Sequence, residues 1–101
     1  MTKQFNVSPD AKQDLDDIWE YYAERDLAYA KKLLTEIAKK FMLLLQYPEM
    51  GRERNDLILN MRSFAVKDYL IFYLPTDYGI EILRVAKASR NLSKLFEDMI
   101  P

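Results

Sequence analysis

The sequence predicts an α+β fold with an N-terminal strand, a helical hairpin packed on one face of a mostly antiparallel sheet, and a short C-terminal helix. Three observations predict this fold. Apolar residues recur at helical spacing from residue 11 to 45, at a spacing of two from residue 61 to 85, and at helical spacing again after residue 91. Such segregation of elements along the chain is typical of helices gathered on one face of an antiparallel sheet.

The first strand and the first helix follow each other directly. Residues 3–7 alternate polar and apolar, which indicates a short strand with one buried face. Ser8 can accept hydrogen bonds from the first helical turn, and Pro9 fits the first helical position because no N–H donor is needed there. The helix is predicted from about residue 9 to 24 by the stripe Ala11, Leu15, Ile18 and Tyr22.

A second helix is predicted up to Tyr47, with the apolar stripe Ala30, Leu33, Leu34, Ile37, Phe41, Leu44 and Leu45. Pro48 disfavours helical backbone at the residue before it, and Gly51 gives freedom for the turn beyond. Residues 52–59 are expected to form a connector.

Three successive strands are predicted over residues 61–66, 69–74 and 80–85. The link Lys67-Asp68 is a poor match to favoured hairpin turns, so a bulge or a shifted boundary is expected there. Residues 69–74 are apolar on both sides, so the face opposite the hairpin should be covered by the C-terminal helix, a partner, or both. That helix should begin behind Ser89 or Asn91 and bury Leu92, Leu95, Phe96 and Met99.

Composition narrows the class of function. A chain of 101 residues is expected to be a single domain, residues 1–101. It has no cysteine and no histidine, which removes disulfides, thiolate nucleophiles, the commonest general base and the commonest metal ligand. We expect no metal, no cofactor, no membrane segment and a cytoplasmic location.

Charge is unevenly distributed. Residues 10–20 are acidic, whereas residues 82–96 carry four cations and no acid. Asp14, Asp16, Asp17 and Glu20 are expected to face solvent, and Trp19, Tyr21, Tyr22 and Tyr29 to pack in the core. Because an acidic helix repels phosphate, direct DNA binding is not expected. A basic surface is predicted from Arg62, Arg84, Lys87, Arg90 and Lys94.

The chain resembles the ParE/RelE superfamily of toxins from type II toxin–antitoxin modules. The resemblance rests on residues 11–22 (AKQDLDDIWEYY), 48–52 (PEMGR), 61–62, 69–73 (YLIFY) and 80–90 (IEILRVAKASR). The first helix and the Pro-x-x-Gly-Arg turn are similar to the ParE branch more than to the RelE branch. Many members carry a histidine soon after the last strand's Arg-Val, where this chain has Ala86 and Lys87.

The resemblance implies a toxin that binds and blocks DNA gyrase, arrests growth, serves plasmid stabilisation and is neutralised by a cognate antitoxin. No catalytic residue is then needed. It implies Arg62, Arg84, Lys87 and Arg90 for target contact, and Leu92, Leu95, Phe96 and Met99 for antitoxin contact. The alternative is a RelE-like endonuclease that cleaves messenger RNA on the ribosome with Arg62, Arg84, Lys87 and Tyr69. Under the first hypothesis, Arg84→Ala and Lys87→Ala should abolish arrest with little change in melting temperature.

Overall fold

The computed structural model describes residues 2–97 of the chain. Its elements in order are β1 (Gln4–Val7), α1 (Pro9–Ala23), α2 (Leu27–Gln46), β2 (Arg52–Glu53), β3 (Arg62–Val66), β4 (Tyr69–Thr76), β5 (Gly79–Lys87) and α3 (Leu92–Leu95). The α+β class and the predicted order of helices and strands are therefore confirmed.

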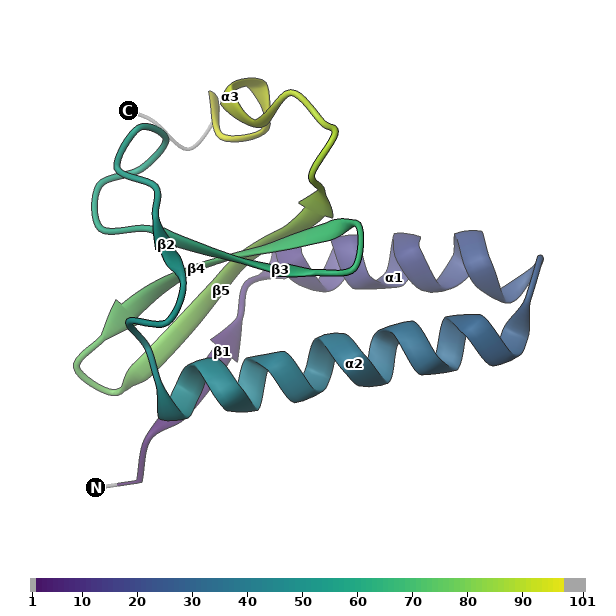
Figure 1. Cartoon of the computed structure of the whole chain (residues 1–101), viewed down its shortest axis with the longest axis horizontal. Helices are drawn as coiled ribbons and strands as arrows, with labels where there is room; N and C mark the ends of the chain where they lie inside the picture. The colour runs from purple at the N-terminus through teal and green to yellow at the C-terminus, as the bar shows by residue number, and fades with distance from the viewer. Residues whose placement is uncertain (1, 98–101) are drawn as a thin grey trace.

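The five strands form one sheet in the order β1-β5-β4-β3-β2. Strand β1 runs parallel to β5, and the other neighbours are antiparallel. The hairpin of α1 and α2 lies on one side of this sheet and α3 on the other, as Figure 1 shows. The helix layer therefore leaves a second sheet face that needs its own cover.

The two hairpin helices begin at polar caps. Ser8 Oγ accepts a hydrogen bond from the Ala11 N–H at 3.0 Å, and Pro9 occupies the first turn, as predicted. Asp26 Oδ1 accepts from the Tyr29 N–H at 3.0 Å and begins α2. Helix α2 ends at Gln46, because Pro48 disfavours a continued helix.

The main core lies between the hairpin and the sheet. Its fully buried members include Leu33, Ile37, Ile71, Tyr73 and Ile82. These side chains come from α2, β4 and β5, so the predicted helical stripe and the predicted strand alternation meet in one cluster.

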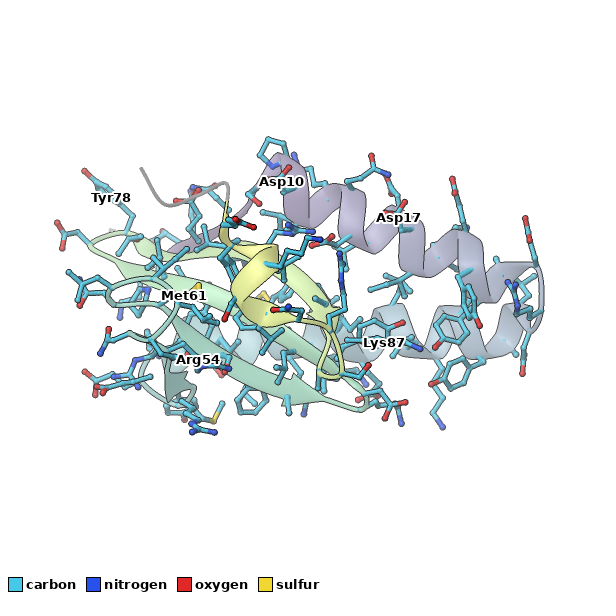
Figure 2. All side chains as sticks on the ribbon, turned by 90° about the horizontal axis from the view of Figure 1, so that it is seen from above. Asp10, Asp17, Arg54, Met61, Tyr78 and Lys87 are labelled. Atoms are coloured by element: carbon cyan, nitrogen blue, oxygen red, sulfur yellow. The ribbon has the colours of Figure 1, made fainter. Side chains whose placement is uncertain are left out.

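A second, smaller cluster covers the opposite sheet face. Phe96 is completely buried and packs edge-on against Phe72, with ring centroids 4.9 Å apart. Leu57 and Met61, which lie between β2 and β3, belong to the same cluster. Figure 2 shows Met61 on the same side of the sheet as α3. The prediction that the C-terminal helix covers this face is confirmed, and Asn91 is its cap.

The predicted irregularity is in a different place. The β3–β4 link is a tight turn in which Lys67 takes a positive φ of 52°, so no bulge is needed there. The bulge lies in β5 instead. Phe72 pairs with Arg84 and Tyr73 with Ile82, which leaves Leu83 as an extra residue.

One further feature went beyond the predictions. Residues 52–53, expected to be connector, form the short edge strand β2 paired with β3. Two residues are too few for a periodic signal. Within residues 2–97, no helix combines the length and the apolar character needed to cross a membrane.

The turn after α2 is held by a buried tyrosine. Tyr73 Oη donates to the Pro48 carbonyl at 2.7 Å and accepts from the Gly51 N–H at 2.8 Å. A Cβ atom at Gly51 would overlap the Tyr73 ring, so the glycine is required by this close approach. The Tyr73 hydroxyl thus satisfies two backbone groups at the end of the hairpin.

We predict that Tyr73→Phe lowers the free energy of unfolding by about 2 kcal/mol, because two buried backbone groups lose their partner. Urea denaturation measures this as a lower midpoint with an unchanged slope. Tyr78→Phe is the matched control, since Tyr78 is 71% exposed. Equal midpoints for both variants would contradict the proposed role of the hydroxyl.

Candidate functional site

The site begins at the edge of β5 that β1 leaves unpaired. Strand β1 pairs with β5 only as far as Ile82, whereas β5 continues to Lys87. The beginning of α1 takes over there: the Ser8 hydroxyl donates to the Leu83 carbonyl at 2.8 Å, and Asp14 Oδ2 accepts from the Val85 N–H at 2.9 Å. Side chains of α1 therefore satisfy backbone groups that a longer β1 would have paired.

The same carboxylate binds Arg84. Arg84 Nε donates to Asp14 Oδ2 at 2.8 Å and Nη2 donates to Oδ1 at 2.9 Å, a bidentate ion pair. The hydrogen bonds to Asp14 raise the pKa of Arg84, against the opposing effect of burial. The Arg84 side chain is 17% exposed, so this pair is largely shielded from water.

Two predictions need correction here. Asp14, expected to face solvent, is buried, whereas Asp16, Asp17 and Glu20 are exposed as predicted. Arg84 is a link between helix and sheet, so we no longer expect Arg84→Ala to leave the melting temperature unchanged. Sequence spacing did not show this, because the two partners are 70 residues apart.

Arg62 does not join the predicted basic surface. It lies two strands away from β5 and pairs with Tyr73, on the face that carries the hairpin. Its Nη1 donates to the Gly51 carbonyl at 2.7 Å and to the Glu49 carbonyl at 3.1 Å, and its Nη2 lies 3.4 Å from Glu53 Oε1. The prediction of one patch that includes Arg62 is therefore wrong.

The remaining cations lie around two hollows that share Arg90. One, of about 260 Å³, is shared with Lys87, and the other, of about 330 Å³, is shared with Arg84 and Lys94. Lys87, Arg90 and Lys94 are exposed, and within residues 2–97 none of them forms a salt bridge. Figure 2 shows Lys87 far from Arg54 and Tyr78, at the other end of the sheet. We call Lys87, Arg90 and Lys94 the basic surface. Arg84, which is fixed by Asp14, lies next to it.

Tyr69 also lines the hollow that contains Lys87. Burial raises the pKa of Tyr69 above its ordinary value, and a hydrogen bond of 3.5 Å between its hydroxyl and that of Tyr22 acts in the same direction. Proton transfer by Tyr69 would require a lowered pKa. Of the four residues in the nuclease alternative, Arg62 lies away from this hollow and Arg84 is paired with Asp14. The pKa of Tyr69 is raised, whereas proton transfer requires it to be lowered.

The aromatic side chains of the hairpin divide into two groups. Tyr22 and Tyr29 pack against the main core, as predicted, with ring centroids 5.1 Å apart. Trp19 and Tyr21 are 37% and 50% exposed, so the prediction that they are core residues is wrong. Tyr21 lines the Lys87 hollow, although the sequence analysis assigned it to the core and not to a site.

Of the residues predicted for antitoxin contact, Leu92 and Leu95 lie on α3 and Phe96 is its C-terminal cap. Phe96 is completely buried, whereas Leu92 and Leu95 are half-buried against the second cluster. Met99 lies outside the described residues. Of the three that the structure describes, Leu92 and Leu95 offer partial surface to another molecule.

Metal chemistry has no visible basis in the part of the chain that the structure describes. No group of three or more acidic side chains in residues 2–97 is placed to hold a metal ion. The site is accordingly described by its ion pair, its exposed cations and its two hollows.

We predict that Asp14→Asn lowers the free energy of unfolding by about 2 kcal/mol, because Arg84 keeps its charge without a buried counter-ion. Chemical denaturation measures the change. Asp17→Asn is the matched control, because Asp17 is exposed and accepts a hydrogen bond from Gln13 on the same helix. Its effect should stay within about 0.5 kcal/mol. If Asp14→Asn is equally mild, the ion pair does not hold the site.

Comparison with known proteins agrees with this geometry. A family model described as the ParE toxin of the type II toxin–antitoxin system parDE matches residues 5–92. Toxin ParE1 of Caulobacter vibrioides is 31% identical over 90 residues, which cover 88% of this chain and 93% of that protein. Toxin ParE3 of the same organism is 31% identical over 81 residues, covering 79% of this chain and 81% of that protein.

A solved structure, described as the chromosomal ParDE TA system from P. aeruginosa, has the same fold. Its TM-score is 0.72 at 20% sequence identity, and the alignment covers 85% of this chain and 96% of that one. The family match spans the first strand, the hairpin, the sheet and the start of α3. The chain therefore belongs to the ParE family of toxins of type II toxin–antitoxin systems.

Proposed function

We propose that this toxin acts by binding DNA gyrase, and that a cognate antitoxin neutralises it by covering the basic surface and α3. The observation that carries the proposal is that the exposed Arg90 lines two hollows, one with Lys87 between α1 and β5 and one with Arg84 and Lys94 beside α3. Exposed cations gathered on one surface attract an acidic or nucleic-acid-bound partner and need no chemical step. Membership of the ParE family gives the expectation of gyrase as the target.

Target contact is proposed for the exposed cations rather than for all four residues first considered. Lys87 and Arg90 are exposed and can contact a partner. Arg84 is bound to Asp14 and fixes the end of the strand that carries Lys87. Arg62 holds the turn after α2 and lies away from this surface. The ribosome-dependent endonuclease is less well supported, because Arg62 lies away from the hollow of Lys87 and Tyr69, Arg84 is paired with Asp14, and the pKa of Tyr69 is raised.

Antitoxin contact is proposed at Leu92 and Leu95. Both retain partial exposure next to the basic surface, and Leu95 lines the same hollow as Arg84 and Lys94. Phe96 would take part only if α3 left the sheet, since it is buried against Phe72. A segment seated on α3 would also screen the neighbouring cations. The P. aeruginosa structure is described as a toxin–antitoxin system, which supports a protein partner of this kind.

We predict that the double variant Lys87→Ala, Arg90→Ala requires about tenfold more protein for half-inhibition of gyrase supercoiling, and no longer arrests growth when expressed. Both side chains are exposed, so the free energy of unfolding should change by less than about 0.5 kcal/mol. The matched control is Lys31→Ala, Lys32→Ala, which removes two exposed cations from α2.

Two assays on the wild-type protein test the target itself: inhibition of gyrase supercoiling, and cleavage of messenger RNA in a translating extract. Supercoiling inhibition without cleavage is the expected result. Cleavage without supercoiling inhibition would replace gyrase by the ribosome as the target. Full activity of the double variant in both assays would show that the exposed cations do not contact the target.

A further inference from the structure

A hollow of about 260 Å³ lies between α1 and the end of β5. Its floor is apolar and comes from both elements, with Ile18 on α1 and Val85 on β5, both buried in the main core. The side chains that line it are Asp14, Asp17, Ile18, Tyr21, Tyr69, Val85, Ala86, Lys87 and Arg90. The volume lies below the range of about 300–1,000 Å³ typical of small-molecule pockets, and suits one large side chain.

The rim of this hollow carries an exposed aromatic ring. Tyr21 is 50% exposed and touches Tyr22 edge-on, with ring centroids 4.8 Å apart. The Arg25 guanidinium lies 3.9 Å from the Tyr21 ring centroid, and Lys87 Nζ lies 6.0 Å from it. A tyrosine held in this way loses little conformational freedom when a partner covers it. Such residues are enriched among the side chains that dominate binding energy.

The charges around the hollow favour an acidic occupant. Lys87 and Arg90 are exposed at the rim. The Asp14 carboxylate is already shared by Arg84 and the Val85 N–H, which leaves Asp17 as the acid at the rim among the residues described. A carboxylate placed next to an apolar group in the hollow would therefore find two cations within reach.

We propose that this hollow receives one large apolar side chain, with a carboxylate beside it, from an acidic protein segment. The inference rests on the proposed function, in which that segment belongs to the antitoxin. A nucleic-acid backbone is a poorer fit, because a phosphate gains nothing from the apolar floor of Ile18 and Val85. An occupant seated here would cover Lys87 and Arg90, so antitoxin and target would compete for the same cations.

The probe is the peptide acetyl-Glu-Glu-Phe-Glu-Glu-amide, titrated into the full-length ¹⁵N-labelled toxin and followed by NMR. We expect saturable shifts at Tyr21, Ala86 and Lys87, with a Kd of about 1 mM or tighter. Replacement of phenylalanine by alanine in the peptide should weaken binding at least about fivefold, because the hollow is left empty. Replacement of all four glutamates by glutamine should do the same, because the rim charges lose their partners.

Variants of the protein separate the hollow from general charge attraction. Tyr21→Ala and Lys87→Gln should each weaken binding about threefold or more. The matched controls Trp19→Ala and Lys31→Gln change an exposed aromatic and an exposed lysine outside the hollow, and should leave the Kd unchanged. Folding of each variant is checked by the dispersion of its own spectrum.

Three outcomes would overturn the proposal. The first is the absence of shifts near the hollow at a peptide concentration of about ten times the expected Kd. The others are equal affinity of the alanine peptide and the phenylalanine peptide, and displacement of the bound peptide by inorganic phosphate at an equal concentration. The supercoiling assay is independent of this result. Gyrase inhibition without peptide binding would contradict the proposed role of the hollow and support gyrase as the target. Peptide binding without gyrase inhibition would support the role of the hollow and contradict gyrase as the target.

Discussion

The carboxylate of Asp14 is the group on which the functional end of the molecule depends. It accepts two hydrogen bonds from Arg84 and one from the Val85 N–H, at the edge of β5 that β1 does not reach. A buried carboxylate is costly unless its oxygens are satisfied and its charge is matched, and here both conditions hold. Because the same atoms join α1 to β5, the last residues of the strand are fixed relative to the hairpin. The positions of Lys87 and Arg90 follow from that attachment.

The β-bulge makes this attachment possible. In a regular strand, Arg84 would share the hairpin-facing side with Ile82, where a guanidinium would lie among apolar side chains. The extra residue Leu83 shifts the alternation by one, so Val85 returns to the main core while Leu83 and Ala86 belong to the second cluster. Arg84 is left at the flank of the sheet, within reach of α1. The bulge therefore keeps both faces of β5 apolar and still presents one cation to Asp14.

Local patterns predicted local structure well. The Ser8-Pro9 helix start, the Asn91 cap and the need to cover the second face of β4 each depend on neighbouring residues or on spacing within one element, and each is confirmed. The failures share a different cause. Asp14 looks like any acid on an acidic helix until its partner, 70 residues away, is placed beside it. Arg62 and Arg84 look alike in sequence, but the sheet order puts them two strands apart. Tyr21 follows the apolar stripe closely enough to suggest burial, and only the packing of α1 against β5 shows that it lies at a rim.

The contrast between Arg84 and its neighbours favours binding over catalysis as the mode of action. The charge of Arg84 is matched by Asp14 and two of its five N–H donors are engaged there. The pKa of Tyr69 is raised, so it holds its proton more tightly than usual. Lys87 and Arg90, by contrast, keep their donors free at the surface, beside an apolar hollow and an exposed ring. Cations of this kind attract a partner from a distance, and the apolar contacts decide how long it stays. If target and antitoxin both require these two cations, one surface is enough for poisoning and for neutralisation, because occupation by either partner excludes the other.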